Sequence, residues 1–193
     1  MPLKQFIERA TLQAGTAIRD WTNGCVTLAT DEVKEAPLDK TIVQVDAEDQ
    51  LRTMVVLGIE GPAGGRMILS FDEANGKRLV NAIVGGLRSP AGVWNELERS
   101  SIMETGNIFA SAYLSGLTEL TGQTFLPSPP LFIEDYQGCV IEEALTPQLM
   151  DRNESLIFKV CFRFSDQSAD WDVFFVPDCD LIRYFDQQME AKG

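Results

Sequence analysis

Apolar residues recur at helical spacing in the longer stretches of the chain and alternate in the shorter ones. This pattern predicts helices over 3–22, from Asp72 to Gly85-Gly86, over about 94–120 and after Pro177-Asp178. Asn23-Gly24 and Gly122 suit the left-handed ends of the first and third of these helices. β-strands are predicted near 26–28, 41–45, 52–59, 66–71, 123–126, 131–133, 155–164 and 170–176.

The order of these elements occurs twice. Residues 52–83 and 155–189 each read as strand, turn, strand and capped helix, with the turns formed by GPAGG and SDQSA. A long helix and shorter strands precede each segment. We therefore predict one α+β domain over 1–193, built of two halves of roughly 1–90 and 91–193. Their hairpins would pair into one mostly antiparallel sheet flanked by helices. The irregular stretch 135–153 is predicted to hold a short helix, with its role open between a partner-binding insertion and an ordinary loop.

Composition excludes several classes of function. A net charge of −13 without a Lys/Arg cluster argues against a nucleic-acid partner. The absence of histidine excludes Ser-His-Asp and Cys-His catalysis and histidine metal sites. No apolar run reaches the roughly 18 residues of a membrane span, and the N-terminus lacks a secretory h-region. The cysteines form no CxxC pair, so we expect a cytoplasmic protein with reduced thiols at Cys25, Cys139, Cys161 and Cys179.

The long predicted helix carries a narrow polar stripe beside its apolar face. On a helical wheel, the apolar residues from Ile102 to Leu120 face the sheet. The polar residues between roughly 280° and 340° are Ser100, Glu104, Asn107 and Ser111. Serine side chains are short and protrude little, so another protein's backbone could approach Glu104 and Asn107 closely. Taken alone, a Glu-Asn pair at this spacing is common on solvated helix faces.

The spacing continues beyond the helix. Ser100-x3-Glu104-x2-Asn107 is followed after 22 residues by Pro130. This arrangement resembles the signature of the CheC/CheX/FliY family of chemotaxis phosphatases, and ELERSSIMETGNIFASAYLSGL, with Gly106 before Asn107, is similar to the family's active helix. The resemblance extends over most of the chain and implies a CheC-like fold.

The resemblance also implies a substrate, the phosphoaspartyl group of a phosphorylated CheY-like response regulator. Asn107 would orient the attacking water, and Glu104 would pair with a lysine of the regulator. Ser100, Ser111 and Pro130 would be binding residues. This chain would hold no metal or cofactor, because Mg²⁺ is expected on the regulator's own carboxylates. A helper protein and the oligomeric state stay open.

The resemblance predicts a matching site in the first half, with Gln13 where Glu belongs and Thr16 where Asn belongs. Asp39 stands where a proline is expected, although Pro37 lies close. Glutamine cannot supply a negative charge to a lysine, so we predict a degenerate first-half site and one working site.

Other functions are weighed against this one. The main alternative is a non-catalytic module, related to flagellar switch proteins, that binds response regulators. A hydrolase using Glu142 and Glu143 is a distant alternative, since adjacent helical residues point about 100° apart. GPAGG lacks the Lys-Ser/Thr of a P-loop and reads as a hairpin turn. Trp21, Trp94 and Trp171 read as packing residues.

Overall fold

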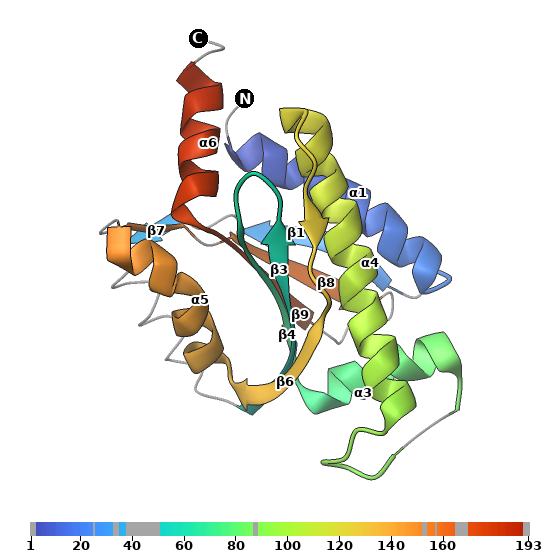
Figure 1. The fold of residues 1–193 in the computed structure, drawn as a ribbon. Coiled ribbons are helices and arrows are strands. Elements are labelled where there is room, and N and C mark those ends of the chain that lie inside the picture. Colours follow the sequence, from blue (N-terminus) through green and yellow to red (C-terminus); the bar gives the residue numbers. More distant parts are fainter. Residues whose placement is uncertain are drawn as a thin grey trace.

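The computed structural model describes residues 3–24, 26–32, 35–37, 51–86, 89–151, 154–156, 158–164 and 170–190 (Figure 1). In chain order the elements are α1 (Leu3–Trp21), β1 (Val26–Glu32), β2 (Glu35–Pro37), β3 (Leu51–Glu60), β4 (Gly65–Phe71), α3 (Glu73–Val84), α4 (Glu96–Thr121), β5 (Leu126–Pro127), β6 (Leu131–Tyr136), α5 (Gln137–Asp151), β7 (Glu154–Leu156), β8 (Phe158–Phe164), β9 (Asp170–Pro177) and α6 (Cys179–Glu190).

A seven-stranded antiparallel sheet forms the centre of the fold. Its strands run in the order β1-β8-β9-β4-β3-β5, and β6 pairs with the same edge of β3 as β5. The hairpins β3–β4 and β8–β9 meet through β4 and β9, where Met67 lies opposite Phe175. The short strands β2 and β7 pair with each other. The predicted α+β fold, with one antiparallel sheet flanked by helices, is therefore confirmed. The division into two similar halves stays a prediction.

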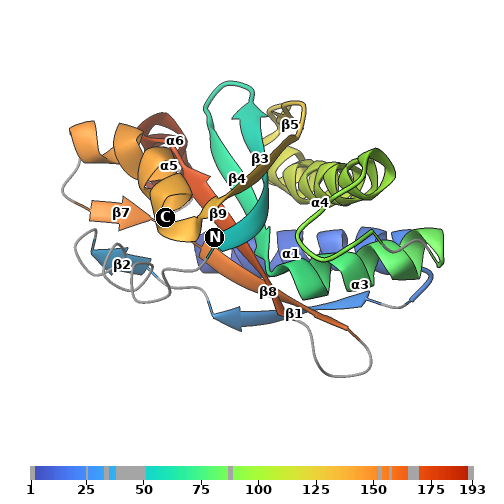
Figure 2. The same ribbon diagram turned by 90° about the horizontal axis from the view of Figure 1, so that it is seen from below.

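The two faces of the sheet bury separate cores. Alternating residues of β3, such as Val55 and Leu57, pack with α1, α3 and α4, whereas Met54 and Val56 pack with α5. Figure 2 shows α1, α3 and α4 gathered on one side of the twisted sheet and α5 on the other. Trp94 and Trp171 are buried in the first core, and Trp21 is half-buried, as packing residues should be.

The helix ends follow the predicted chemistry. The Asp72 carboxylate accepts the Asn75 N–H at 2.7 Å, and Gly85 ends α3 with φ of 73°. Gly122 ends α4 in the left-handed conformation. At the last helix, Asp178 Oδ1 accepts the Leu181 N–H at 2.8 Å. GPAGG connects β3 to β4 as a turn, as predicted.

Three parts of the second half differ from the prediction. The strand expected over 123–126 is the two-residue β5, and the strand expected over 131–133 extends to Tyr136. The stretch 135–153 contains the 15-residue helix α5 rather than a short one. Its apolar residues Val140, Ile141, Ala144 and Leu145 cover the second face of the sheet, which stabilises the helix despite Pro147. The strand predicted over 41–45 lies outside the described residues.

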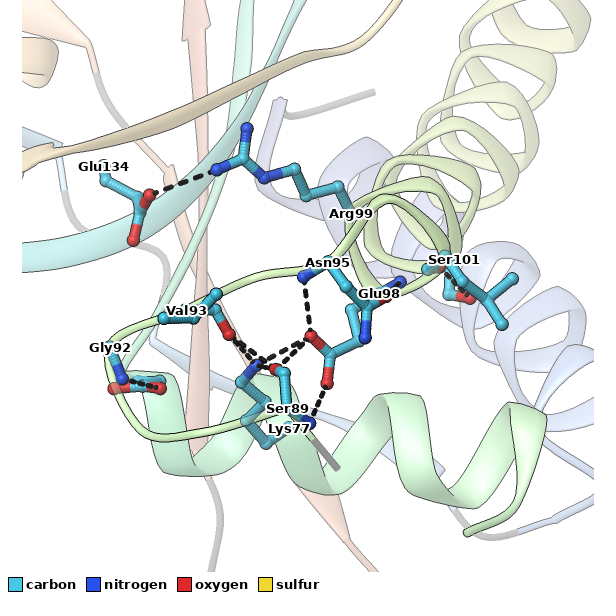
Figure 3. A network of polar contacts seen from close by, with 11 residues as sticks. Lys77, Ser89, Gly92, Val93, Asn95, Glu98, Arg99, Ser101 and Glu134 are labelled. Atoms are coloured by element: carbon cyan, nitrogen blue, oxygen red, sulfur yellow. Dashed lines mark hydrogen bonds and ion pairs between the residues drawn. The ribbon is translucent and has the colours of Figure 1, made fainter. Parts of the chain in front are cut away.

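A buried carboxylate anchors the N-terminus of α4. Glu98, with 0% of its surface exposed, accepts hydrogen bonds from Lys77 Nζ at 2.8 Å and Ser89 Oγ at 2.5 Å (Figure 3). It also accepts the Asn95 N–H at 2.9 Å, and its own N–H donates to Asn95 Oδ1 at 2.9 Å. This capping box joins α3, the 89–95 connector and α4. Lys77 also donates to the Val93 carbonyl.

The same contacts decide the protonation of Glu98. Burial pushes the pKa of the Glu98 carboxyl upward, but the hydrogen bonds from Lys77, Ser89 and Asn95 outweigh burial and lower the pKa from 4.5 to about 2. The unfolded chain therefore binds a proton at this carboxyl at higher pH than the folded chain does. The stabilisation is complete above about pH 4.5 and is lost as the pH falls towards 2.

We expect Glu98→Gln to be less stable than the wild type at pH 7, because Lys77 loses its charged partner. The difference in unfolding free energy should shrink by roughly 3 kcal/mol between pH 4.5 and pH 2. Denaturant titrations across this range measure it, with Glu142→Gln, an exposed residue of α5, as the control that should follow the wild type. A difference that stays constant with pH would contradict the assignment.

Candidate functional site on helix α4

The predicted polar stripe lies on the solvent side of α4. Ser100 and Glu104 are exposed, and Asn107 and Ser111 are half-buried. Within the described part of the chain, neither the Glu104 carboxylate nor the Asn107 amide makes a hydrogen bond or an ion pair. Both groups are therefore accessible and unpaired, as a site that acts on another molecule requires.

Helix α1 covers a different flank of α4. Trp21 Nε1 donates to Thr105 Oγ1 at 3.1 Å, and a Cβ at Gly116 would lie 3.3 Å from the Ala10 backbone. Because early residues of α1 meet late residues of α4, the two helices run antiparallel. Thr105 lies about 100° around α4 from Glu104, so α1 leaves the polar stripe uncovered.

The sheet contacts α4 through Gly106. A Cβ at this position would meet Val55 Cγ1 at 2.8 Å and Leu57 Cδ1 at 3.7 Å, so the helix backbone rests directly on β3. Asn107 follows Gly106 in the chain and leaves the helix about 100° further round. The close contact thus places Asn107 at the margin between the buried face and solvent.

Pro130 lies at the same edge of the sheet. The preceding Ser128 is fixed to β3, since its N–H donates to the Gly58 carbonyl at 2.9 Å and its Oγ accepts the Gly58 N–H at 2.8 Å. Leu131 pairs with Val56, so Pro130 is next to Leu57, beneath Gly106. The register therefore puts Pro130 on the α4 side of β3, next to the helical turn that carries Asn107.

Arg99 ties α4 to the strand after Pro130. Its guanidinium lies 5.1 Å from the centre of the Phe132 ring, and its Nη2 is 3.9 Å from Glu134 Oε2 (Figure 3). Phe132 also packs edge-on against Trp94, with ring centroids 5.7 Å apart. Sequence reasoning missed Arg99, because the predicted strand 131–133 contained Phe132 but ended before Glu134.

The first half uses its corresponding positions differently. Gln13 Nε2 donates to Glu119 Oε2 at 3.0 Å, and Arg9 Nη2 lies 3.8 Å from the same oxygen. Thr16 Oγ1 donates to the carbonyl of Leu12. Gln13 is thus part of the contact between α1 and α4. Pro37 belongs to β2, and Asp39 lies outside the described residues.

The remaining candidates do not form sites. Glu143 Oε1 pairs with Arg66 Nη1 at 3.1 Å, and Glu142 is exposed on α5, so no carboxylate pair converges there. Cys139 is exposed, and Cys179 is buried with its thiol donating to the Pro147 carbonyl at 3.4 Å. Among the described residues, no cluster of three acidic or cysteine side chains could hold a metal ion, and no helix is long and apolar enough to cross a membrane.

Comparison with known proteins identifies the class of this fold. FliY of Thermotoga maritima superposes with a TM-score of 0.68 at 16% identity, covering all of both chains. CheX of Borrelia burgdorferi, in its complex with CheY, BeF₃ and Mg²⁺, superposes with a TM-score of 0.58 at 16% identity, covering 89% of this chain and 97% of that one. The architecture is therefore the one found in CheX and FliY.

A sequence relationship adds to the fold. CheC1 of Halobacterium salinarum, named as a proposed CheY-P phosphatase, is 26% identical over 123 residues, which are 64% of this chain and 62% of that protein. No family model matches the chain. The chain therefore has the fold of the CheX and FliY structures and is similar in sequence to a CheC protein, in agreement with the resemblance noted in the sequence.

We expect Gly106→Ala to lower the unfolding free energy by roughly 1–3 kcal/mol, because the added methyl would overlap the Val55 side chain and force α4 away from β3. By helix propensity alone, alanine would be more stable here than glycine by about 1 kcal/mol. A lower unfolding free energy of Gly106→Ala would therefore reflect the overlap with Val55 and not helix propensity.

The matched test adds Val55→Ala, which removes the methyl that would collide. In denaturant titrations, Gly106→Ala should cost less in the Val55→Ala background than in the wild type. Equal costs in both backgrounds would show that the contact does not limit the approach of the helix.

Proposed function

We propose that this protein is a phosphatase that removes the phosphoryl group from the phosphoaspartate of a CheY-like response regulator in chemotaxis or two-component signalling. The observation that carries the proposal is the Asn107 amide, which is accessible and has no partner within the described residues, one turn from the exposed Glu104. The relationship to CheC1 and the fold shared with CheX support the choice of substrate.

The proposed hydrolysis needs little covalent chemistry from the enzyme. A water oxygen attacks phosphorus as the bond between phosphorus and the aspartyl oxygen breaks, so a carboxylate leaves and inorganic phosphate keeps the protons of the water. The carboxylate is a good leaving group, and positioning of the water supplies the acceleration. The Asn107 amide oxygen accepts a hydrogen bond from this water and holds it in line with the breaking bond. A neutral amide needs no titration, so the lack of histidine is no obstacle.

Glu104 has a docking role in this proposal. Its carboxylate lies on the same side of α4, one turn before Asn107, and pairs with a lysine beside the phosphoryl group of the regulator. Ser100 and Ser111 keep the helix surface low on both sides, and Pro130 borders it at the edge of β3. The divalent cation belongs to the regulator, whose carboxylates hold it against the phosphoryl oxygens. We also propose a cytoplasmic location, where such a regulator acts.

The alternative is a module that binds the regulator without hydrolysis. The Asn107 amide, which has no partner among the residues that the structure describes, favours the phosphatase, because a surface that only docks does not need an unpaired carboxamide beside its charged contact. Binding without accelerated release of phosphate would favour the alternative.

We expect Asn107→Ala to reduce the accelerated dephosphorylation about 100-fold, which corresponds to about 2.7 kcal/mol of transition-state stabilisation. Binding of the regulator and stability should change little, since the amide makes no hydrogen bond within the described chain. Decay of a phosphorylated CheY-like regulator measures the effect. Thr146→Ala, at an exposed position on α5 on the other face of the sheet, is the control. Decay at the wild-type rate with Asn107→Ala would refute the phosphatase proposal.

A further inference from the structure

One large apolar side chain lies on the same side of α4 as the candidate site. Among the α4 residues whose exposure is described, Leu97 is the large aliphatic one that stays open to solvent, at 47%. It precedes Glu104 by seven residues, which is 20° short of two helical turns, so the two side chains leave the same side of the helix. The axial distance between them is about 10.5 Å.

Toward the C-terminus of α4, the described side chains on this side of the helix are small. Ser111 follows Glu104 by seven residues, and Ser115 lies one turn further on, exposed, with its hydroxyl donating to the Ser111 carbonyl at 2.9 Å. The surface is therefore asymmetric along α4, with an apolar end at Leu97, the Glu104–Asn107 pair in the middle and a low end at Ser111 and Ser115. Such a surface fits a partner in one orientation.

The usual area of a protein–protein interface indicates which molecule contacts Leu97. A stable complex buries about 800 Å² on each partner, which corresponds to a patch of about 16 Å radius. A patch centred on Asn107 reaches Leu97, which is about 15 Å away along the helix axis. A response regulator whose interface is of this size and centred on Asn107 therefore also covers Leu97.

We infer that Leu97 is a specificity-determining contact for the response regulator, which must present an apolar patch about 10 Å from the lysine that meets Glu104. The inference rests on the proposed function, because it takes Asn107 as the centre of the interface. The patch and the lysine together set the direction in which the regulator lies along α4. Regulators with a charged or polar group at that place bind weakly, even where their phosphoaspartate is intact.

The test compares three variants with the wild type. Leu97→Ser removes the contact, Leu97→Met preserves it, and Leu126→Ser is the matched control. Leu126 is 57% exposed but pairs with Glu60, whose side chain points to the α5 face of the sheet. The measurements are kcat and KM on a phosphorylated CheY-like regulator, and Kd for the same regulator activated with beryllofluoride.

We expect Leu97→Ser to raise KM and Kd about fivefold, or roughly 1 kcal/mol, with kcat unchanged. Leu97→Met and Leu126→Ser should match the wild type. Unchanged KM and Kd in Leu97→Ser would overturn the inference. So would a dimer of the wild type, seen by sedimentation, that Leu97→Ser dissolves without altering Kd, because a second copy would then cover Leu97.

The result is separable from the phosphatase proposal. Asn107→Ala tests hydrolysis through kcat, whereas Leu97→Ser tests docking through Kd, which does not require turnover. A normal Kd in Leu97→Ser together with an inactive Asn107→Ala refutes only the docking inference. A weakened Kd together with a fully active Asn107→Ala refutes the phosphatase role and leaves the docking surface in place.

Discussion

The antiparallel pairing of β4 with β9 is the contact on which the rest of the structure depends. It joins the two hairpins and sets their register, with Leu69 opposite Val173 and Met67 opposite Phe175. These residues face the same core, so the two halves contribute to one continuous apolar surface beneath α1, α3 and α4. A shift by one residue would turn every side chain of one half to the other face and separate the halves into two incompatible layers.

The candidate site follows from what this arrangement leaves open. The sheet packs against the side of α4 that carries Gly106, and α1 packs against the side that carries Thr105. Glu98 fixes the first turn of the helix against α3, which prevents rotation about its axis. The flank with Glu104 and Asn107 is the remaining one, and it borders the edge of β3 where Pro130 lies. Accessibility of the amide is therefore a result of packing on the other sides.

Sequence reasoning succeeded where structure is decided by neighbours along the chain. The period of α4, the cap at Asp72 and the turn at GPAGG are local signals, and the polar stripe could be placed from helical geometry alone. Helix α5 was underestimated because Pro147 interrupts its pattern, whereas its stability comes from covering the second face of the sheet. The Lys77–Glu98 and Arg99–Phe132 contacts join segments more than twenty residues apart, so no local pattern could reveal them.

The two predicted halves differ in a way that explains why we place one site, not two, on this fold. At the position that corresponds to Glu104, the first half has Gln13, whose amide donates to the Glu119 carboxylate at 3.0 Å. A glutamate there would set two carboxylates against each other, and one of them would have to stay protonated or move away. Arg9, 3.8 Å from Glu119, is largely exposed and would offset little of this repulsion. The close antiparallel contact of α1 with α4 therefore favours an amide at position 13, whereas Glu104 has no such neighbour among the described residues and is available to a partner.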